Sequence, residues 1–264
     1  MSATTASSVK TDRDFTGKVA FVSGASRGIG AATARLLAQR GASVGINYNR
    51  SEAAAKAVAS DAESFGAATV LVQADVTNAE EVAAAVDTVE AKLGPIDVAV
   101  INAHALDNPA RAPFGKVPQW LVEEVILRQV RALLIPARHI IPRMADRGRG
   151  SVVVVTSTQV LHPAEQMLAL AMGKGALDVG VKSLAIEYSP QGVRVNAIAP
   201  GPVLTDATST LLTEEYKQAR ADITPLGRLA VAGDVAGAIV ALASDDCGFC
   251  TGATLQVNGG IVMA

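Results

Sequence analysis

The sequence contains very few cysteines, and this scarcity limits the kinds of site it can form. Only two of its 264 residues are cysteines, Cys247 and Cys250, which form a single C-x-x-C motif. No second cysteine pair or nearby histidine completes a zinc site. A redox pair normally lies at the start of a helix that comes after a strand, whereas these cysteines come after the apolar run that ends before S-D-D. We therefore interpret the motif as two buried or half-buried thiols in a loop, and we expect no metal site.

Net charge, long apolar runs and a leader-like segment are also missing. The net charge is −2, which excludes a general attraction to nucleic acid or to anionic membranes. Apolar runs are interrupted by Gly, Asp or Arg well before they reach membrane-spanning length. Residues 1–14 are polar and carry no apolar signal core, so we expect a flexible tail on a cytoplasmic protein.

The rest of the chain, residues 15–264, alternates strand-like and helix-like segments. Half of all residues are hydrophobic, which is enough for one large domain with a substantial core. Continuous Val/Ile-rich runs between amphipathic segments predict an α/β protein with a doubly wound parallel sheet in a single domain. We expect strands at 19–23, 43–48, 69–73, 98–102, 152–156, 193–198 and 254–257. We expect helices at 29–40, 52–65, 79–93, 119–144 and 167–188.

A glycine-rich segment, S-G-A-S-R-G-I-G at 23–30, follows the first expected strand and opens the first helix. Glycines at such a turn let the backbone approach a pyrophosphate at a helix N-terminus. A tight turn without a ligand is the alternative. The candidate contacts in this turn are Gly24, Ser26, Gly28, Ile29 and Gly30.

The end of the second expected strand indicates which dinucleotide would bind. An acidic residue there would bind the ribose 2′-OH of NAD. The chain instead reads Asn49-Arg50-Ser51, and Arg27 in the glycine turn adds a second cation. Because guanidinium groups suit phosphate, these residues predict NADP(H) as the cofactor. Two solvated surface arginines are the alternative.

Further motifs accompany the glycine turn. Q-A-D-V-T-N at 73–78 places Asp75 and Val76 where an adenine would lie. I-N-A-H at 101–104, A-P-G-P-V-L-T-D at 199–206 and T-G-A-T-L-Q-V-N-G-G at 251–260 complete a pattern that resembles the classical short-chain dehydrogenase/reductase family over about residues 15–262. The resemblance implies a Rossmann-like fold and adds the cofactor contacts Asn102, Ala103, Lys174, Pro200, Gly201, Val203 and Thr205.

The expected active site departs from the family's Asn-Ser-Tyr-Lys pattern. Ser157, at the end of a strand, matches the serine, and Lys174 matches the lysine that holds the nicotinamide ribose in the family. The tyrosine position, four residues before the lysine, is Leu170, and the asparagine position falls near Gln129. Leucine cannot donate the proton that an alkoxide needs after hydride transfer.

Histidines are the candidates for a replacement acid. His104 follows the fourth strand at the cofactor crevice, and His162 lies in the next crevice loop. A histidine titrates near neutrality, so each is a candidate catalytic acid, with a structural role as the alternative. Glu165 in the same loop is a further possible acid, whereas His139 on the long helix is expected to be structural.

These features together predict an NADPH-dependent reductase in specialised metabolism, acting on a hydrophobic quinone, imine or conjugated carbonyl. The alternatives are a non-redox cyclase, isomerase or lyase on the same scaffold, or a catalytically silent NADP-binding protein. Segment 204–228 is where the family usually carries a mobile lid, and the apolar helices 119–144 and 167–188 predict a homodimer or homotetramer. The residues expected on the substrate side are Pro109, Phe114, Met167 and Leu170.

Overall fold

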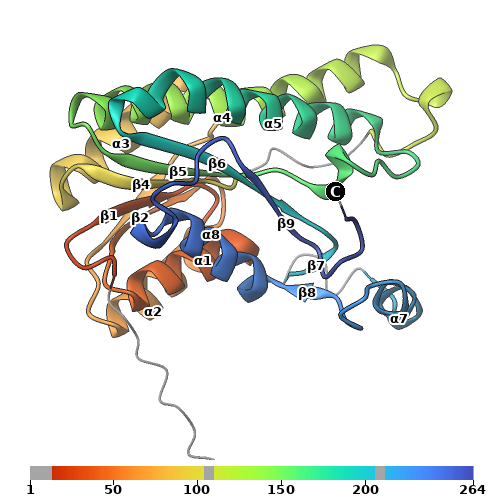
Figure 1. Ribbon diagram of the computed structural model, residues 1–264, viewed down its shortest axis with the longest axis horizontal. Coiled ribbons are helices and arrows are strands. Elements are labelled where there is room, and N and C mark those ends of the chain that lie inside the picture. The colour runs from red at the N-terminus through yellow and green to blue at the C-terminus, as the bar shows by residue number, and fades with distance from the viewer. Residues whose placement is uncertain (1–13, 104–109, 206–211, 264) are drawn as a thin grey trace, which may run out of the picture.

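Seven parallel strands form the central sheet of the computed structural model, which describes residues 14–103, 110–205 and 212–263. Their order across the sheet is β3-β2-β1-β4-β5-β6-β9 (Figure 1). The strands are β1 (Val19–Val22), β2 (Ser43–Tyr48), β3 (Thr69–Gln73), β4 (Ile96–Ile101), β5 (Gly150–Val155), β6 (Val193–Pro200) and β9 (Thr254–Val257). A separate two-stranded pair consists of β7 (Val203–Leu204) and β8 (Ala230–Val231).

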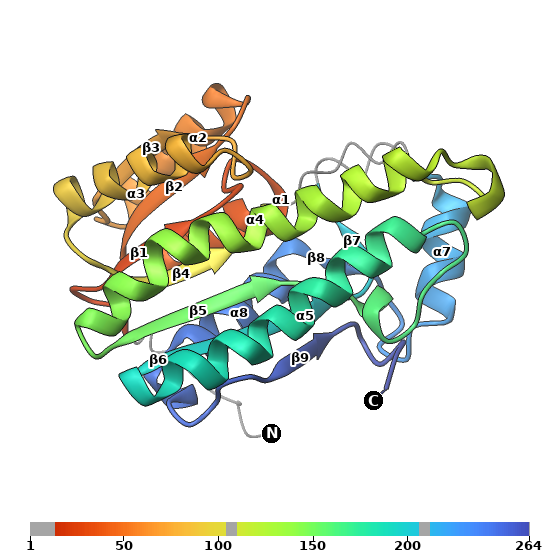
Figure 2. The ribbon, with the colours of Figure 1, turned by 90° about the horizontal axis from the view of Figure 1, so that it is seen from above.

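Helices cover both faces of the sheet, which gives the doubly wound α/β architecture that the sequence predicts. On one face lie α1 (Gly28–Gln39), α2 (Glu52–Ser64) and α8 (Ala232–Ala243) (Figure 1). On the other face lie α3 (Ala79–Leu93), α4 (Gln119–Asp146) and α5 (Leu168–Tyr188), with α4 and α5 side by side (Figure 2). The short α7 (Glu214–Asp222) comes between β7 and β8 in the chain and lies at the edge of the molecule, past this strand pair (Figure 2).

The strands form because their Val, Ile and Ala side chains are buried on both faces. Every residue of β1 is buried, and so is all of β2 and β5 except the first residue of each. One hydrophobic cluster lies between the sheet and α1, α2 and α8, and a second lies between the sheet and α3, α4 and α5. β1 pairs with both β2 and β4, so the strand order reverses there, and such a switch point creates a crevice at the carboxyl ends of the strands.

Some elements differ from the sequence expectations. β4 begins at Ile96, two residues earlier than expected, and α4 continues to Asp146 although Pro136 and Pro142 lie inside it. The sequence patterns predict neither α7 nor α8, and they do not predict the β7–β8 pair. No helix in the described segments is long and apolar enough to cross a membrane. Most of the predicted tail, residues 1–13, lies outside the described residues.

Candidate active site

The turn between β1 and α1 has a backbone that suits only glycine at its key positions. Gly24 and Gly28 have φ angles of 61° and 56°, in the left-handed region that favours glycine. A Cβ atom at Gly24 would stand 3.0 Å from the Cα of Ala103, and one at Gly30 would stand 2.6 Å from Nδ2 of Asn102. The turn is therefore packed closely against the residues that follow β4.

Ser23 and Asn102 join the glycine turn to the end of β4. The Asn102 side-chain amide donates to the carbonyl oxygens of Ser23, at 3.0 Å, and Gly24, at 3.2 Å. The Ser23 hydroxyl accepts from the backbone N–H groups of Asn102, at 2.9 Å, and Ala103, at 3.0 Å. The N-terminus of α1 has no side-chain cap, so its first N–H groups remain available to an anion such as a pyrophosphate.

Asn47 lies near the end of β2, in the region where an acidic side chain would indicate NAD. Its side chain is almost fully buried; Oδ1 accepts from the N–H of Gly24 at 3.1 Å, and Nδ2 donates to the carbonyl of Ala74 at 3.1 Å. The oxygen and the nitrogen of this amide therefore both form hydrogen bonds to backbone groups. Arg27 and Arg50 are exposed, and neither guanidinium forms an ion pair or hydrogen bond with the described residues.

Asp75 is fixed in the segment between β3 and α3. Its Oδ1 accepts hydrogen bonds from the backbone N–H of Thr77, at 2.9 Å, and from the Thr77 hydroxyl, at 2.8 Å. Burial raises the pKa of the carboxyl group, but these hydrogen bonds and the nearby Arg128 outweigh it and hold the pKa of Asp75 below its ordinary value. The carboxylate is ionised at neutral pH and can accept a hydrogen bond from an amino group such as that of adenine, and Val76 beside it is buried.

The residues expected at the nicotinamide follow Pro200, the last residue of β6. Gly201 donates its N–H to the carbonyl of Val257 at 3.1 Å, which fixes this segment against the end of β9. Thr205 lies against the glycine turn, since a Cβ atom at Gly28 would stand 3.4 Å from its Cγ2. The segments predicted for the pyrophosphate and the nicotinamide thus come together, and this close-fitting glycine cradle is compatible with a dinucleotide.

Lys174, on α5, reaches the end of β5, where Ser157 follows. Its Nζ donates to the carbonyl of Val155 at 2.7 Å, and the residue is only 4% exposed. Ser157 is half-buried two residues further along, and its hydroxyl accepts from the N–H of Gln159 at 3.2 Å. Burial lowers the pKa of Lys174 to about 8 because it removes water from the ammonium group.

Leu170 occupies the first turn of α5, four residues before Lys174. It is half-buried, and because of the spacing the two side chains lie on the same side of the helix. Tyr188, the tyrosine of α5, is the last residue of the helix and lies at its opposite end. Position 170 therefore presents a hydrocarbon side chain on the same face as the lysine ammonium.

Gln129, at the expected asparagine position, carries an unpaired amide in the contact between α4 and α5. The side chain is fully buried, and neither Oε1 nor Nε2 has a hydrogen-bond partner among the described residues. A Cβ atom at Gly173 would stand 2.8 Å from Cγ of Gln129, so the two helices approach closely one residue before Lys174. An unpaired buried amide costs about 1–3 kcal/mol, and such groups in native proteins often indicate a bound water or a functional role.

The structure describes some of the candidate acids and not others. His162 follows the short 3₁₀ helix Thr158–Val160 with an exposed side chain, and Glu165 in the same loop is also exposed. His104 and Pro109 lie outside the described residues. His139 is half-buried on α4.

The loop before α5 contains a backbone feature that the sequence does not reveal. Gln166 has a φ angle of 61°, which is uncommon for a residue with a side chain. Of the apolar residues expected on the substrate side, Met167 directly after it and Leu170 in the first turn of α5 are half-buried, whereas Phe114 is 72% exposed. Strained residues of this kind cost about 1–3 kcal/mol and are concentrated at functional sites.

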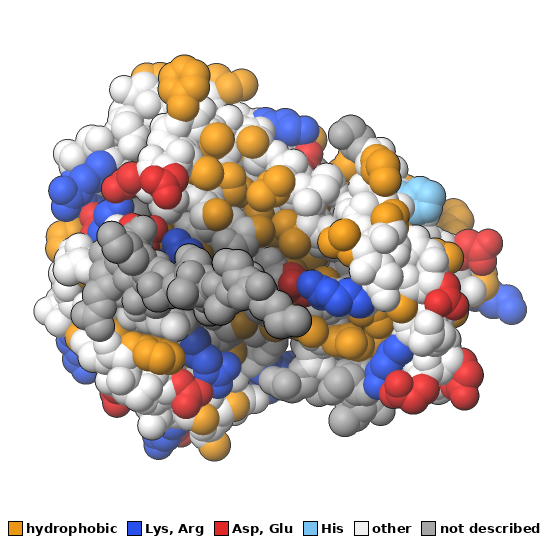
Figure 3. Space-filling model, turned by 60° about the horizontal axis from the view of Figure 1, so that its bottom comes forward, with side chains coloured by type: hydrophobic (Ala, Val, Ile, Leu, Met, Phe, Trp, Pro, Cys, Tyr) orange, Lys and Arg blue, Asp and Glu red, His pale blue; other side chains and the backbone are white. Residues whose placement is uncertain are grey.

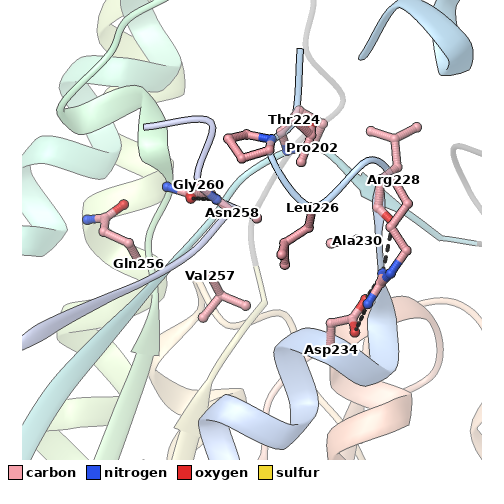
Figure 4. Close-up of a pocket in the computed structure, with 13 residues that line it drawn as sticks. Pro202, Thr224, Leu226, Arg228, Ala230, Asp234, Gln256, Val257, Asn258 and Gly260 are labelled. Atoms are coloured by element: carbon pink, nitrogen blue, oxygen red, sulfur yellow. Dashed lines mark hydrogen bonds and ion pairs between the residues drawn. The ribbon is translucent and has the colours of Figure 1, made fainter. Parts of the chain in front are cut away.

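A cavity of about 520 Å³ lies between the end of β9 and the segment that leads into α8 (Figure 4). On one wall Arg228 forms two hydrogen bonds, of 2.7 and 2.8 Å, to the Asp234 carboxylate. Ser157 and Lys174 do not line it. Hydrophobic side chains gather around a hollow in the face of the molecule that Figure 3 shows. Other residues that line the cavity are Pro202, Thr224, Leu226 and Asn258.

The two cysteines are free thiols, and they follow α8. Both are half-buried, in agreement with the interpretation of the C-x-x-C motif, and burial raises the pKa of Cys247. The residues that the structure describes include no group of three or more His, Cys, Asp or Glu side chains able to hold a metal ion.

Known proteins share both the sequence pattern and the fold. Residues 24–262 match the family model described as enoyl-(acyl carrier protein) reductase. Glucose 1-dehydrogenase from Gluconobacter oxydans is 31% identical over 252 residues, which cover 94% of this chain and 93% of that protein. A 7α-hydroxysteroid dehydrogenase complexed with NADH and 7-oxo glycochenodeoxycholic acid has a TM-score of 0.88 and 30% identity, covering 95% of this chain and 96% of that one. A mutant of a Serratia marcescens short-chain dehydrogenase/reductase has a TM-score of 0.86 and 30% identity, covering 94% and 99%.

Proposed function

Because the chain belongs to the short-chain dehydrogenase/reductase family of oxidoreductases, we propose that it is an NADPH-dependent reductase of a hydrophobic small molecule. The observation that carries the proposal is the closely packed turn of Gly24, Gly28 and Gly30, which ends at the uncapped N-terminus of α1 beside the end of β4. When bound, the dinucleotide supplies a hydride from its reduced nicotinamide. The glycine turn would hold its pyrophosphate, and Asp75 its adenine.

The end of β2 supports NADPH over NADH. Asn47 presents no carboxylate to a ribose hydroxyl, and its buried side-chain amide is held on the backbone by its bonds to Gly24 and Ala74. Arg27 and Arg50 offer guanidinium groups that no described residue engages, and a 2′-phosphate would pair with them through charge-assisted hydrogen bonds.

The leucine at position 170 favours a substrate whose reduction needs little proton donation by the protein. Hydride addition to an iminium ion produces a neutral amine, and a quinone or conjugated carbonyl spreads the developing negative charge. Met167 and Leu170 provide apolar surface at the start of α5, which suits the hydrophobic part of such a molecule. The Ser157 hydroxyl would donate one hydrogen bond to the reacting group.

The same leucine favours a second candidate, a non-redox cyclase, isomerase or lyase on this scaffold. In that case NADPH would bind without being consumed. A catalytically silent protein would bind NADPH and convert nothing.

Helices α4 and α5 support assembly into a homodimer or homotetramer. On α4, Trp120, Leu127 and Leu134 recur every seven residues with exposed fractions of 66%, 43% and 52%. On α5, Met172, Val179 and Ile186 do the same at 51%, 62% and 80%. Seven-residue spacing puts each set on one side of its helix, as in interfaces between packed helices. Light scattering at micromolar concentration would contradict this assembly if it returned the mass of a monomer.

Cofactor preference is tested by titrating the purified protein with NADPH and NADH. We expect NADPH to bind more tightly by about 1–3 kcal/mol, the range for charged hydrogen bonds. Arg50→Ala should reduce that preference and leave NADH binding unchanged. Arg149→Ala is the matched control, because it removes an exposed arginine just before β5, at the opposite end of the strands from the cofactor crevice. Equal dissociation constants for the two cofactors in the unmodified protein would contradict the assignment.

Reductase activity is tested by following the absorbance of NADPH with a panel of quinones, cyclic imines and activated ketones. We expect NADPH oxidation with at least one class. A product formed without NADPH oxidation would favour the non-redox candidate. Binding without any turnover across the panel would favour the silent protein.

A further inference from the structure

We propose that Lys174 itself donates the proton to the oxygen of a carbonyl substrate, in the role that a hydroxyl at position 170 would otherwise fill. The inference rests on the proposed reductase function and concerns the same site. It is carried by the position of the Lys174 ammonium between α5 and the end of β5, on the face of α5 that Leu170 shares.

The geometry of α5 directs the lysine side chain toward the missing hydroxyl. Side chains on a helix tilt toward its N-terminus, so a long side chain covers the turn before its own position. Lys174 therefore extends toward the level of Leu170, one turn earlier. Its Nζ ends 2.7 Å from the carbonyl of Val155, two residues before Ser157. The leucine side chain has no hydroxyl, so at this level of the helix the ammonium of Lys174 is the group that can donate a proton.

The surroundings of Lys174 suit a group that exchanges a proton near neutral pH. Burial lowers the pKa of Lys174 to about 8, and among the described residues its hydrogen-bond partner is a carbonyl and not a carboxylate. On α5 the nearest acid is Asp178, which is paired with Lys182 at 2.8 Å. Burial alone causes the shift in the pKa of Lys174, with no contribution from the charged and titratable groups on the elements packed against α5. These groups are Glu123, Glu124, Arg128, Arg131, Arg138, His139, Arg143 and Asp146 on α4, Arg194 on β6, and the exposed His162 after Thr158–Val160.

The proposed step balances without a further reactant. The carbonyl carbon accepts the hydride from C4 of the reduced nicotinamide, and the π electrons of the C=O bond move to oxygen. That oxygen takes a proton from Nζ of Lys174, which leaves a neutral amine and an alcohol. The amine of Lys174 then recovers a proton from solvent. An iminium substrate would complete the same hydride transfer without using the proton.

Lys174→Arg separates proton donation from positive charge. Arginine keeps a cation in the pocket but does not release its proton in proteins. The two probes are 2,2,2-trifluoroacetophenone, a ketone that needs a proton, and N-methyl-3,4-dihydroisoquinolinium, an iminium that does not. At saturating NADPH we expect kcat for the ketone to fall by about 10²–10⁴-fold, the usual value of one general acid. We expect kcat for the iminium to stay within about threefold of the unmodified enzyme.

The pH profile and a titration of the protein alone provide independent readouts. Ketone reduction by the unmodified enzyme should decline as pH rises through about 8, because the acid is then lost, whereas iminium reduction should not. In the cofactor-free protein, NMR of ¹³Cε-labelled lysine should show one resonance that titrates near pH 8 and disappears in Lys174→Arg.

Each outcome supports or overturns the proposal. Equal losses with ketone and iminium would show that Lys174 acts through binding or folding, and unchanged ketone reduction would show that another group is the acid. Either result, or a Lys174 resonance that titrates near 10.5, overturns the inference and leaves the reductase function intact. Absence of NADPH oxidation with both probes in the unmodified enzyme overturns the inference, and across the wider panel it overturns the reductase function.

Discussion

Replacing Gly173 with alanine tests the close contact between α4 and α5 beside Lys174. The new Cβ atom would stand 2.8 Å from Cγ and 2.9 Å from Cβ of Gln129, closer than such atoms normally approach. Overpacking of this kind costs about 1–3 kcal/mol. Alanine also stabilises a helix relative to glycine by about 1 kcal/mol. The expected net change in the free energy of unfolding is therefore a loss of about 0–2 kcal/mol.

Gly237→Ala is the matched control because it isolates the helix preference. Gly237 lies in the middle of α8, is exposed, and has no atom within 4 Å of the position that a Cβ would take. We expect this variant to gain about 1 kcal/mol. The two variants should thus differ by about 1–3 kcal/mol in urea unfolding, or by roughly 2–12 °C in Tm, at equal protein concentration. If Gly173→Ala were as stable as Gly237→Ala, α4 and α5 would not approach as closely as described.

Two further predictions concern the reacting site and the Arg228–Asp234 pair. Leu170→Tyr should increase activity on an activated ketone, by less than the about 10²–10⁴-fold that one general acid contributes, since the new hydroxyl shares a role that Lys174 already fills; tight NADPH binding without hydride transfer to any activated carbonyl would refute it. The hydrogen bonds from Arg228 lower the pKa of Asp234 to about 2 from an ordinary 3.8, so the carboxylate stabilises the folded state above pH 3.8 and loses that effect as the pH falls through 2. The stability difference between Asp234→Asn and the unmodified protein should therefore shrink over this interval in acid unfolding, and a difference that stayed constant would contradict the pairing.

The sequence predicts those parts of the site whose residues are neighbours along the chain. The glycine turn, Ser157 at the end of β5 and the Leu170–Lys174 spacing each follow from a short local pattern. Seven strands and five long helices are predictable for the same reason, because their hydrophobic patterns are continuous. α8 is missed because it is apolar almost all around, which removes the periodic contrast that indicates a helix.

Other features depend on contacts between distant segments, and a single sequence does not contain that information. The bonds from Asn102 to Ser23 join residues 79 apart, and Asn47 connects β2 to both the glycine turn and the end of β3. The unpaired amide of Gln129 becomes visible only when α4 packs on Gly173. The exposure of the His162 side chain likewise depends on the path of its loop. Its position after Ser157 in the sequence makes it a candidate acid but does not indicate how exposed it is.

The most direct measurement of the central claim is the transfer of deuterium from NADPH that carries deuterium at both C4 positions of the nicotinamide. The protein would be incubated with this cofactor and an activated ketone, and the product alcohol examined by mass spectrometry and NMR. We expect one deuterium on the carbinol carbon and an equal amount of NADP⁺. Product without deuterium, or conversion of substrate while NADPH remains reduced, would contradict the claim that this chain is a reductase.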